Sequence, residues 1–181
     1  MIKKLINFYI FFIFVSTSLN AHAQKVIIGS TPINKLLTWI DFKGMPDAKS
    51  SFDAMTYWSI NYKIDKIKEL DAQMVFEGFE VVLKFDSSKS WSKPAKATAA
   101  LLTHEQGHFN IGLLCMKEIL LNKAVATFNK KNFNEKLQNI FSTAYKKYQD
   151  MGLKYDEETN HSKNNVAQLK WDLFFKEQLA L

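Results

Sequence analysis

Residues 94–130 read PAKATAALLTHEQGHFNIGLLCMKEILLNKAVATFNK, and this stretch decides the fold class. Its apolar residues recur three and four positions apart, which predicts one long helix over about 94–130. Ser92 is a suitable N-cap, and Pro94 falls in the first turn, where its missing N–H costs nothing. The segment 104–108, HEQGH, lies inside this helix and not in a loop.

The chain before the long helix has the composition of β-strands. Aromatic and β-branched residues are concentrated in three segments, 37–42, 55–62 and 73–85. Gly78 marks a bulge or turn that would divide the third segment into a bent pair. We therefore expect an antiparallel sheet in the N-terminal half.

Two more helices are expected after the long one. The first should run from about Asn134 to Asp150 and stop at Gly152, and the second from about Thr159 or Ser162 to near the C-terminus. Strands come first and helices follow, so the predicted fold class is α+β.

The N-terminal residues predict export. A basic start is followed by an apolar run over 5–15, which is shorter than the ~20 residues that span a bilayer. Ala21 and Ala23 are the small residues that a signal peptidase reads. We expect residues 1–23 to be a signal peptide cleaved after Ala23, which predicts a secreted or periplasmic protein without stable membrane insertion; an uncleaved anchor is the alternative. The remaining residues, 24–181, have the length of a single domain.

The charge and cysteine content narrow the functional classes. The 181-residue chain has a formal net charge of +6, and every basic residue is lysine. Without arginine the chain lacks the bidentate donor most used to read guanine edges and clamp phosphates, so we expect no nucleic-acid partner. Cys115 is the only cysteine, which excludes an intramolecular disulfide; on an apolar helix it is expected to be a buried small hydrophobe.

The HEQGH segment predicts a zinc site. Residues four apart on a helix lie on one face, so His104 and His108 can reach a single ion. Glu105 is offset around the helix, where a carboxylate can act as the general base that takes a proton from water activated by the metal. A motif of this kind on a long central helix makes the expected fold zincin-like.

The third zinc ligand is expected to be His161. Apart from His22 in the predicted signal peptide it is the only further histidine, and catalytic zinc commonly takes three protein ligands plus water. Asp156, Glu157 and Glu158 are the alternatives, because a carboxylate also completes such sites.

Several segments resemble the bacterial domain of unknown function 922 family, whose members are described as predicted secreted zinc-dependent proteases. The resemblance is carried by the run 101–109, Ser90-Trp91, the early segment 37–44, and the late segment 155–161 with Gln168 and Trp171. It covers nearly all of residues 24–181 and implies the zinc site and a late histidine. Ser162 stands where the family pattern leads us to expect a glycine.

Two further hypotheses concern the substrate side of the site. Tyr155 could donate a hydrogen bond to the oxyanion formed at the substrate carbonyl, or it could be an anchoring aromatic. The segment 84–91 could pair with an extended peptide as an edge strand, or it could be an ordinary closing strand.

Together these features predict a zinc-dependent metallopeptidase of the export compartment. His104, His108 and His161 would bind Zn²⁺, Glu105 and Tyr155 would act in catalysis, and the partner would be a peptide or protein substrate. The alternatives are a non-catalytic zinc-binding envelope protein and a zinc amidase that acts on cell-wall peptides. The oligomeric state is not predictable.

Overall fold

The computed structural model describes residues 24–28, 31–32 and 36–179. The predicted signal peptide, residues 1–23, lies outside this range. No helix within the described part is long and apolar enough to cross a membrane.

The structure is α+β, with strands before helices, as the sequence predicts. The strands are β1 (Gln24–Ile28), β2 (Thr31–Pro32), β3 (Ala54–Met55), β4 (Trp58–Lys63), β5 (Lys66–Leu70), β6 (Gln73–Glu77), β7 (Glu80–Phe85) and β8 (Trp91–Ser92). The helices are α1 (Ala99–Val125), α2 (Phe133–Thr159) and α3 (Asn165–Leu179), with 3₁₀ turns at Trp39–Asp41 and Pro94–Lys96.

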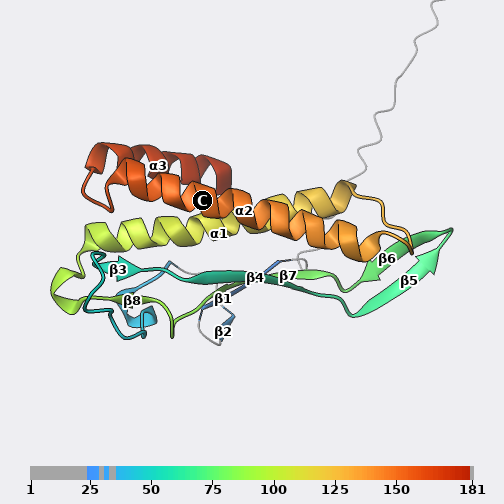
Figure 1. Cartoon of the computed structure of the whole chain (residues 1–181), viewed down its shortest axis with the longest axis horizontal. Coiled ribbons are helices and arrows are strands. Elements are labelled where there is room, and N and C mark those ends of the chain that lie inside the picture. Colours follow the sequence, from blue (N-terminus) through green and yellow to red (C-terminus); the bar gives the residue numbers. More distant parts are fainter. Residues whose placement is uncertain (1–23, 29–30, 33–35, 180–181) are drawn as a thin grey trace, which may run out of the picture.

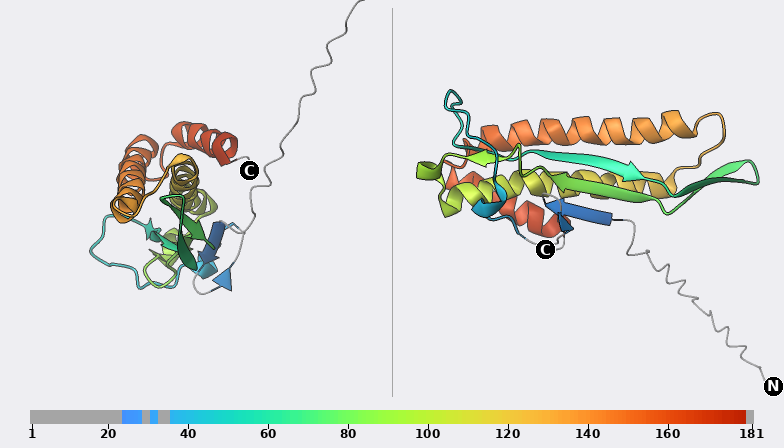
Figure 2. Two further views of the ribbon diagram at one scale, coloured as in Figure 1. Left: turned by 90° about the vertical axis from the view of Figure 1, so that its right-hand side faces the viewer. Right: turned by 90° about the horizontal axis from the view of Figure 1, so that it is seen from below.

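The helices gather on one side of the molecule and the strands on the other (Figure 1). Helix α1 lies between the two layers, because it contacts β4 and β7 on one side and both α2 and α3 on the other. Seen along its length, the molecule shows the three helices grouped above the strands (Figure 2).

The main sheet is mixed and not purely antiparallel, which corrects the prediction. Its strand order is β2-β1-β7-β4; β4 pairs with β7 antiparallel, but β1 pairs with β7 parallel. The prediction missed β1 because it placed no strand before residue 36. β5 and β6 form a separate hairpin, and Asp71 and Ala72 at its tip both have positive φ (49° and 62°), as a two-residue hairpin turn requires.

The segment 37–42 was predicted to be a strand but contains a 3₁₀ turn. The Asp41 carboxylate accepts hydrogen bonds from both the backbone N–H and the hydroxyl of Thr38, each at 2.8 Å. This local capping holds the chain in a tight turn, which outweighs the β propensity of the neighbouring aromatic residues. The other two predicted segments do form strands, with Gly78 at φ 63° between β6 and β7.

The helix bounds also differ from the predicted ones. Helix α1 begins at Ala99, where the hydroxyl of Thr98 accepts a hydrogen bond from the N–H of Leu101 at 3.2 Å, and ends at Val125. Helix α2 passes through Gly152 and ends only at Thr159. A single glycine weakens a helix by about 1 kcal/mol, which packing of α2 against α1 can offset.

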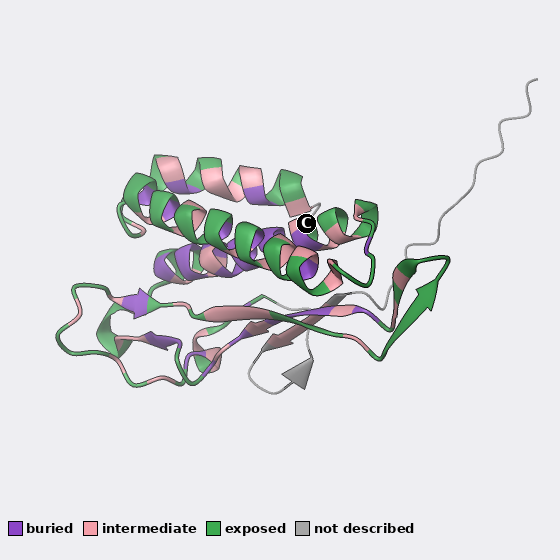
Figure 3. Ribbon diagram, turned by 45° about the vertical axis from the view of Figure 1, so that its right-hand side comes forward, coloured by how far each residue is buried: buried purple, intermediate pink, exposed green. Residues whose placement is uncertain are grey.

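The core lies mainly between α1 and its neighbours. In Figure 3 the buried positions run along α1 and β7, while the outer faces of α2 and α3 are exposed. At Gly112 a Cβ atom would lie only 3.0 Å from side-chain atoms of Leu83 and Trp58, so the absent side chain allows α1 to approach the sheet closely. Cys115 is fully buried, as expected, and burial raises the pKa of its thiol to about 12.

Candidate metal centre

Helix α1 presents His104 and His108 on one face, because they stand one helical turn apart. Their ring centroids are 4.9 Å apart and their planes are nearly perpendicular. His104 is almost fully buried, whereas the His108 side chain is partly exposed. The spacing of the HEQGH segment therefore produces the juxtaposition that the sequence predicts.

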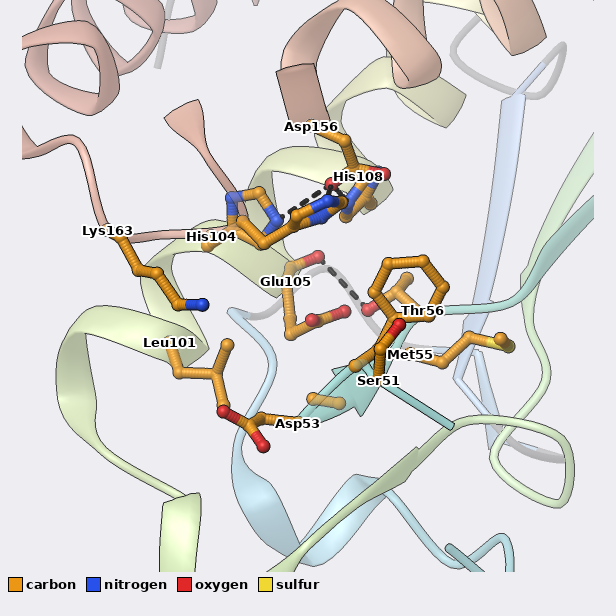
Figure 4. A pocket seen from close by; sticks show the side chains of 13 residues that line it. Ser51, Asp53, Met55, Thr56, Leu101, His104, Glu105, His108, Asp156 and Lys163 are labelled. Atoms are coloured by element: carbon orange, nitrogen blue, oxygen red, sulfur yellow. Dashed lines mark hydrogen bonds and ion pairs between the residues drawn. The ribbon is translucent and has the colours of Figure 1, made fainter. Parts of the chain in front are cut away.

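Helix α2 brings a carboxylate to this pair of histidines. The Oδ1 atom of Asp156 lies 3.0 Å from Nε2 of His104 and 3.0 Å from Nε2 of His108. The three ligand atoms lie within 4.8 Å of one another, close enough to hold one ion. Figure 4 shows the three side chains converging on one point above Glu105.

The expected third ligand, His161, lies beside this cluster. Its Nδ1 atom is 3.3 Å from Oδ1 of Asp156, its side chain is 43% exposed, and its ring packs against Phe52 with 4.9 Å between centroids. Among the described residues the group whose ligand atoms meet consists of His104, His108 and Asp156, without His161. The structure thus favours Asp156, one of the carboxylate alternatives, for the third position.

The turn that carries His161 has an unusual backbone. Asn160, His161 and Ser162 all have positive φ, at 47°, 49° and 72°, and Asn160 caps the end of α2. Left-handed conformation costs a non-glycine residue about 1–2 kcal/mol. Ser162 therefore occupies a position that suits a glycine, which agrees with the glycine expected from the family pattern.

Tyr155 lies behind the histidines and does not line the pocket, which argues against its predicted catalytic role. Its ring stacks on His104 at 4.6 Å, and its hydroxyl donates to the backbone carbonyl of His104 at 3.1 Å. The residue is fully buried, and burial raises the pKa of its hydroxyl well above the usual range, so the hydroxyl stays protonated. The position favours the alternative, an anchoring aromatic.

Gly107 explains how this tyrosine can come so close to α1. A Cβ atom at residue 107 would lie 2.2 Å from the hydroxyl oxygen of Tyr155 and 2.5 Å from its Cζ. Only glycine leaves room for the ring at this position in the helix. Packing between α1 and α2 thus requires glycine at position 107 of the HEQGH segment.

Gln168 and Thr159 hold His104 from the other side of its ring. The Nδ1 atom of His104 lies 3.3 Å from Oε1 of Gln168 and 3.4 Å from the hydroxyl of Thr159. An N–H at Nδ1 leaves the lone pair of Nε2 facing the cluster, as a metal-ligating histidine requires. No role was predicted for Gln168, since it is 64 positions from His104 and no local pattern links the two.

Glu105 is the most unusual group of the site. It is 3% exposed, and its Oε2 atom has no hydrogen-bond partner within the described residues. Burial raises the pKa of its carboxyl, and the nearby charges of His108 and His104 only partly oppose this. A carboxylate with a raised pKa and a free oxygen is suited to accept a proton.

The other charged groups stabilise one another. Burial disfavours the charged form of Asp156, but hydrogen bonds from His104 and His108 hold the pKa of its carboxyl well below the usual range. Burial likewise opposes protonation of His108, yet its hydrogen bond to Asp156 and the charge of Glu105 raise the pKa of the imidazole.

The cluster opens into a cavity of about 300 Å³. One wall is the face of α1 that carries Leu101 and Glu105, and the facing wall is the segment 51–56, which includes β3. The turn after α2 contributes His161 and Lys163 to the lining, and Figure 4 shows Lys163 at this side of the cavity. Glu105 and the cluster therefore line the same cavity.

A comparison with known protein families identifies the family of this chain. The family model described as bacterial protein of unknown function (DUF922) matches residues 26–162. The chain belongs to this family. The comparison with curated proteins and the comparison with solved structures gave no match.

The match to DUF922 covers the chain from β1 to the turn after α2. It therefore includes both histidines of α1, Glu105, Asp156 and His161, but ends before Gln168 on α3. Two imidazoles and a carboxylate are a donor set typical of zinc. The buried, unpartnered oxygen of Glu105 beside that set also fits a bound ion with its water, so the residues present are compatible with Zn²⁺.

Proposed function

We propose that this DUF922 protein is an exported zinc-dependent metallopeptidase with a zincin-like arrangement. The proposal rests above all on Glu105, whose carboxylate is buried and whose Oε2 atom has no partner within the described residues. Burying an unsatisfied acceptor costs about 1–3 kcal/mol, and more for a charged one. A carboxylate kept in this state next to a metal-binding cluster is what a general base requires.

The roles of the residues follow from their positions. His104, His108 and Asp156 would hold the ion, and Gln168 would fix the orientation of the His104 ring. When bound, zinc would supply Lewis-acid activation of the water that attacks the peptide carbonyl. Glu105 would take the proton from that water and deliver it to the leaving nitrogen, since its raised pKa suits both transfers.

Metal content and hydrolysis test the proposal together. Elemental analysis of the purified protein should give one zinc per chain, and the protein should hydrolyse an unstructured substrate such as casein. Glu105→Gln should keep the zinc and lose hydrolysis, whereas His104→Ala should lose both. A Glu105→Gln variant that cleaves casein at the parent rate would remove Glu105 as the base.

Two further variants decide the third ligand. With Asp156 in that position, Asp156→Asn should weaken zinc binding strongly, while His161→Ala should retain it. Zinc lost from His161→Ala and kept in Asp156→Asn would restore the sequence-based assignment. Loss from both would indicate four protein ligands.

A second candidate is a zinc-binding envelope protein without catalytic activity, and the position of His161 is the observation that favours it. Its Nδ1 atom is 3.3 Å from the Asp156 carboxylate. Four protein donors would close the coordination shell, as in structural zinc sites. Such a protein would bind zinc in the same assays but hydrolyse neither casein nor cell-wall peptides; hydrolysis of the latter alone would indicate the amidase alternative.

A further inference from the structure

The cavity next to Glu105 has a short strand along one wall. β3 pairs with β8 antiparallel, and within the described residues it pairs with no other strand. The predicted edge segment, 84–91, does not form an edge strand: residues 84–85 belong to β7 inside the main sheet, residues 86–90 form a turn, and Trp91 in β8 pairs with Met55. The free strand edge next to the candidate site therefore belongs to β3.

The hydrogen-bond register identifies which backbone groups face outward. The N–H of Lys93 donates to the carbonyl of Asp53 at 2.8 Å, so this residue pair is directly hydrogen-bonded. Antiparallel pairs alternate, so the next pair, Ala54 with Ser92, is non-hydrogen-bonded and the N–H and C=O of Ala54 point away from β8. One donor and one acceptor of Ala54 thus remain for the main chain of an extended peptide.

A lysine stands across the cavity from this strand. The side chain of Lys163 points into the pocket, opposite Met55 and Thr56 (Figure 4). Two of the pocket carboxylates have other partners: Asp156 contacts the histidines, and Asp53 lies 3.9 Å from the ammonium of Lys93. No carboxylate in the described part of the chain forms an ion pair with Lys163, so its ammonium is available to a carboxylate that enters the pocket.

We propose that the cavity binds an extended peptide along the free edge of β3 and that Lys163 binds a carboxylate of this peptide. The proposal rests on the function above and narrows its substrate class to acidic peptides. The carboxylate could be a side chain or the free C-terminus. The free edge of β3 and the ammonium of Lys163 would bind a peptide with either carboxylate by the same chemistry.

Binding to an inactive protein separates this proposal from hydrolysis. Zinc-loaded Glu105→Gln protein would be titrated with alanine hexapeptides blocked at both ends, in which one glutamate, or one glutamine as its neutral match, is moved through the six positions. At least one glutamate peptide should bind about fivefold more tightly than its glutamine match, as for a partly exposed ion pair. An unblocked alanine hexapeptide would show the same gain only if the terminal carboxylate is the group recognised.

Two lysine variants test whether Lys163 is the cation that binds the peptide carboxylate. Adding Lys163→Met should abolish the preference for the carboxylate, while Lys146→Met, which removes an exposed charge from α2, should leave it unchanged. A preference that survives Lys163→Met, or equal binding of all peptides, would overturn the assignment to Lys163.

Methylation of single peptide N–H groups tests the pairing with β3. The methyl group that replaces the N–H bonded to the Ala54 carbonyl should weaken binding about fivefold, so the loss should be confined to one position. A uniform effect along the peptide would refute the strand-edge geometry. Casein hydrolysis by the unmodified protein is scored separately, so absent hydrolysis with Lys163-dependent binding would refute the catalytic proposal alone.

Discussion

The same substitution should have opposite effects at two helical glycines. Gly107 lies in α1 and Gly152 in α2. Replacing glycine by alanine in a helix normally stabilises it by about 0.5–1 kcal/mol, because alanine loses less backbone entropy. The structure predicts that this holds at Gly152, where a Cβ atom would have an ordinary contact of 3.9 Å with Nδ1 of His108.

At Gly107 the added methyl group would overlap with Tyr155, which cannot move easily. The ring of Tyr155 is fully buried against His104 and Trp171, and its hydroxyl donates to a carbonyl of α1. Overpacking costs about 1–3 kcal/mol and each disturbed hydrogen bond about 1 kcal/mol. After subtraction of the helix gain, we expect Gly107→Ala to destabilise the protein by about 2–3 kcal/mol.

Thermal unfolding of both variants in the presence of a chelator measures this difference without a contribution from metal binding. For a domain of this size about 1 kcal/mol shifts the midpoint by 2–4 °C. Gly107→Ala should lower the midpoint by about 5–10 °C, and Gly152→Ala should raise it by about 1–4 °C. A Gly107→Ala variant as stable as the parent would refute the packing of Tyr155 against α1.

Three further predictions concern sites away from the motif. Ser162→Gly should raise the unfolding midpoint, since relief of the left-handed serine outweighs the entropy gained by the unfolded chain, whereas Ser142→Gly inside α2 should lower it. Cys115 should resist iodoacetamide at pH 8 in the folded protein and react on denaturation, as mass spectrometry would show, because its pKa is raised to about 12. Burial raises the pKa of the Glu118 carboxyl, but hydrogen bonds from Lys147 and Tyr148 outweigh burial, so the pKa is lowered. The contribution of Glu118 to stability should therefore be present above its ordinary pKa and be lost as the pH falls through the lowered pKa. Urea unfolding from pH 7 to pH 3 should therefore show a weaker acid dependence in Glu118→Gln.

The features that the sequence predicts correctly depend on local geometry. Helical periodicity places His104 and His108 on one face without reference to the rest of the fold. The α+β order is predicted in the same way, because strand composition up to residue 85 is followed by helical periodicity over 94–130. Strand pairing is not local: nothing in the sequence of β1 indicates that it pairs with a strand more than fifty residues later in parallel.

The choice between Asp156 and His161 depends on where α2 ends. A helix that stopped at Gly152 would leave both residues in a loop, and residue type alone would then favour His161 as the third ligand. Because α2 continues to Thr159, Tyr155 and Thr159 lie one helical turn apart and both contact His104 on α1, which places Asp156 beside the histidines. The prediction failed at Gly152 because packing between two helices overrides the propensity of one residue.

The energetics of the centre also bear on its purpose. Asp156 and His108 stabilise each other, so a site that served only to hold an ion could be built from such pairs. Glu105 has no such compensation for its Oε2 atom, and its burial lowers the stability of the fold. Stability lost in this way at one carboxylate, next to a cavity of about 300 Å³, favours the proposed reaction over a purely structural role.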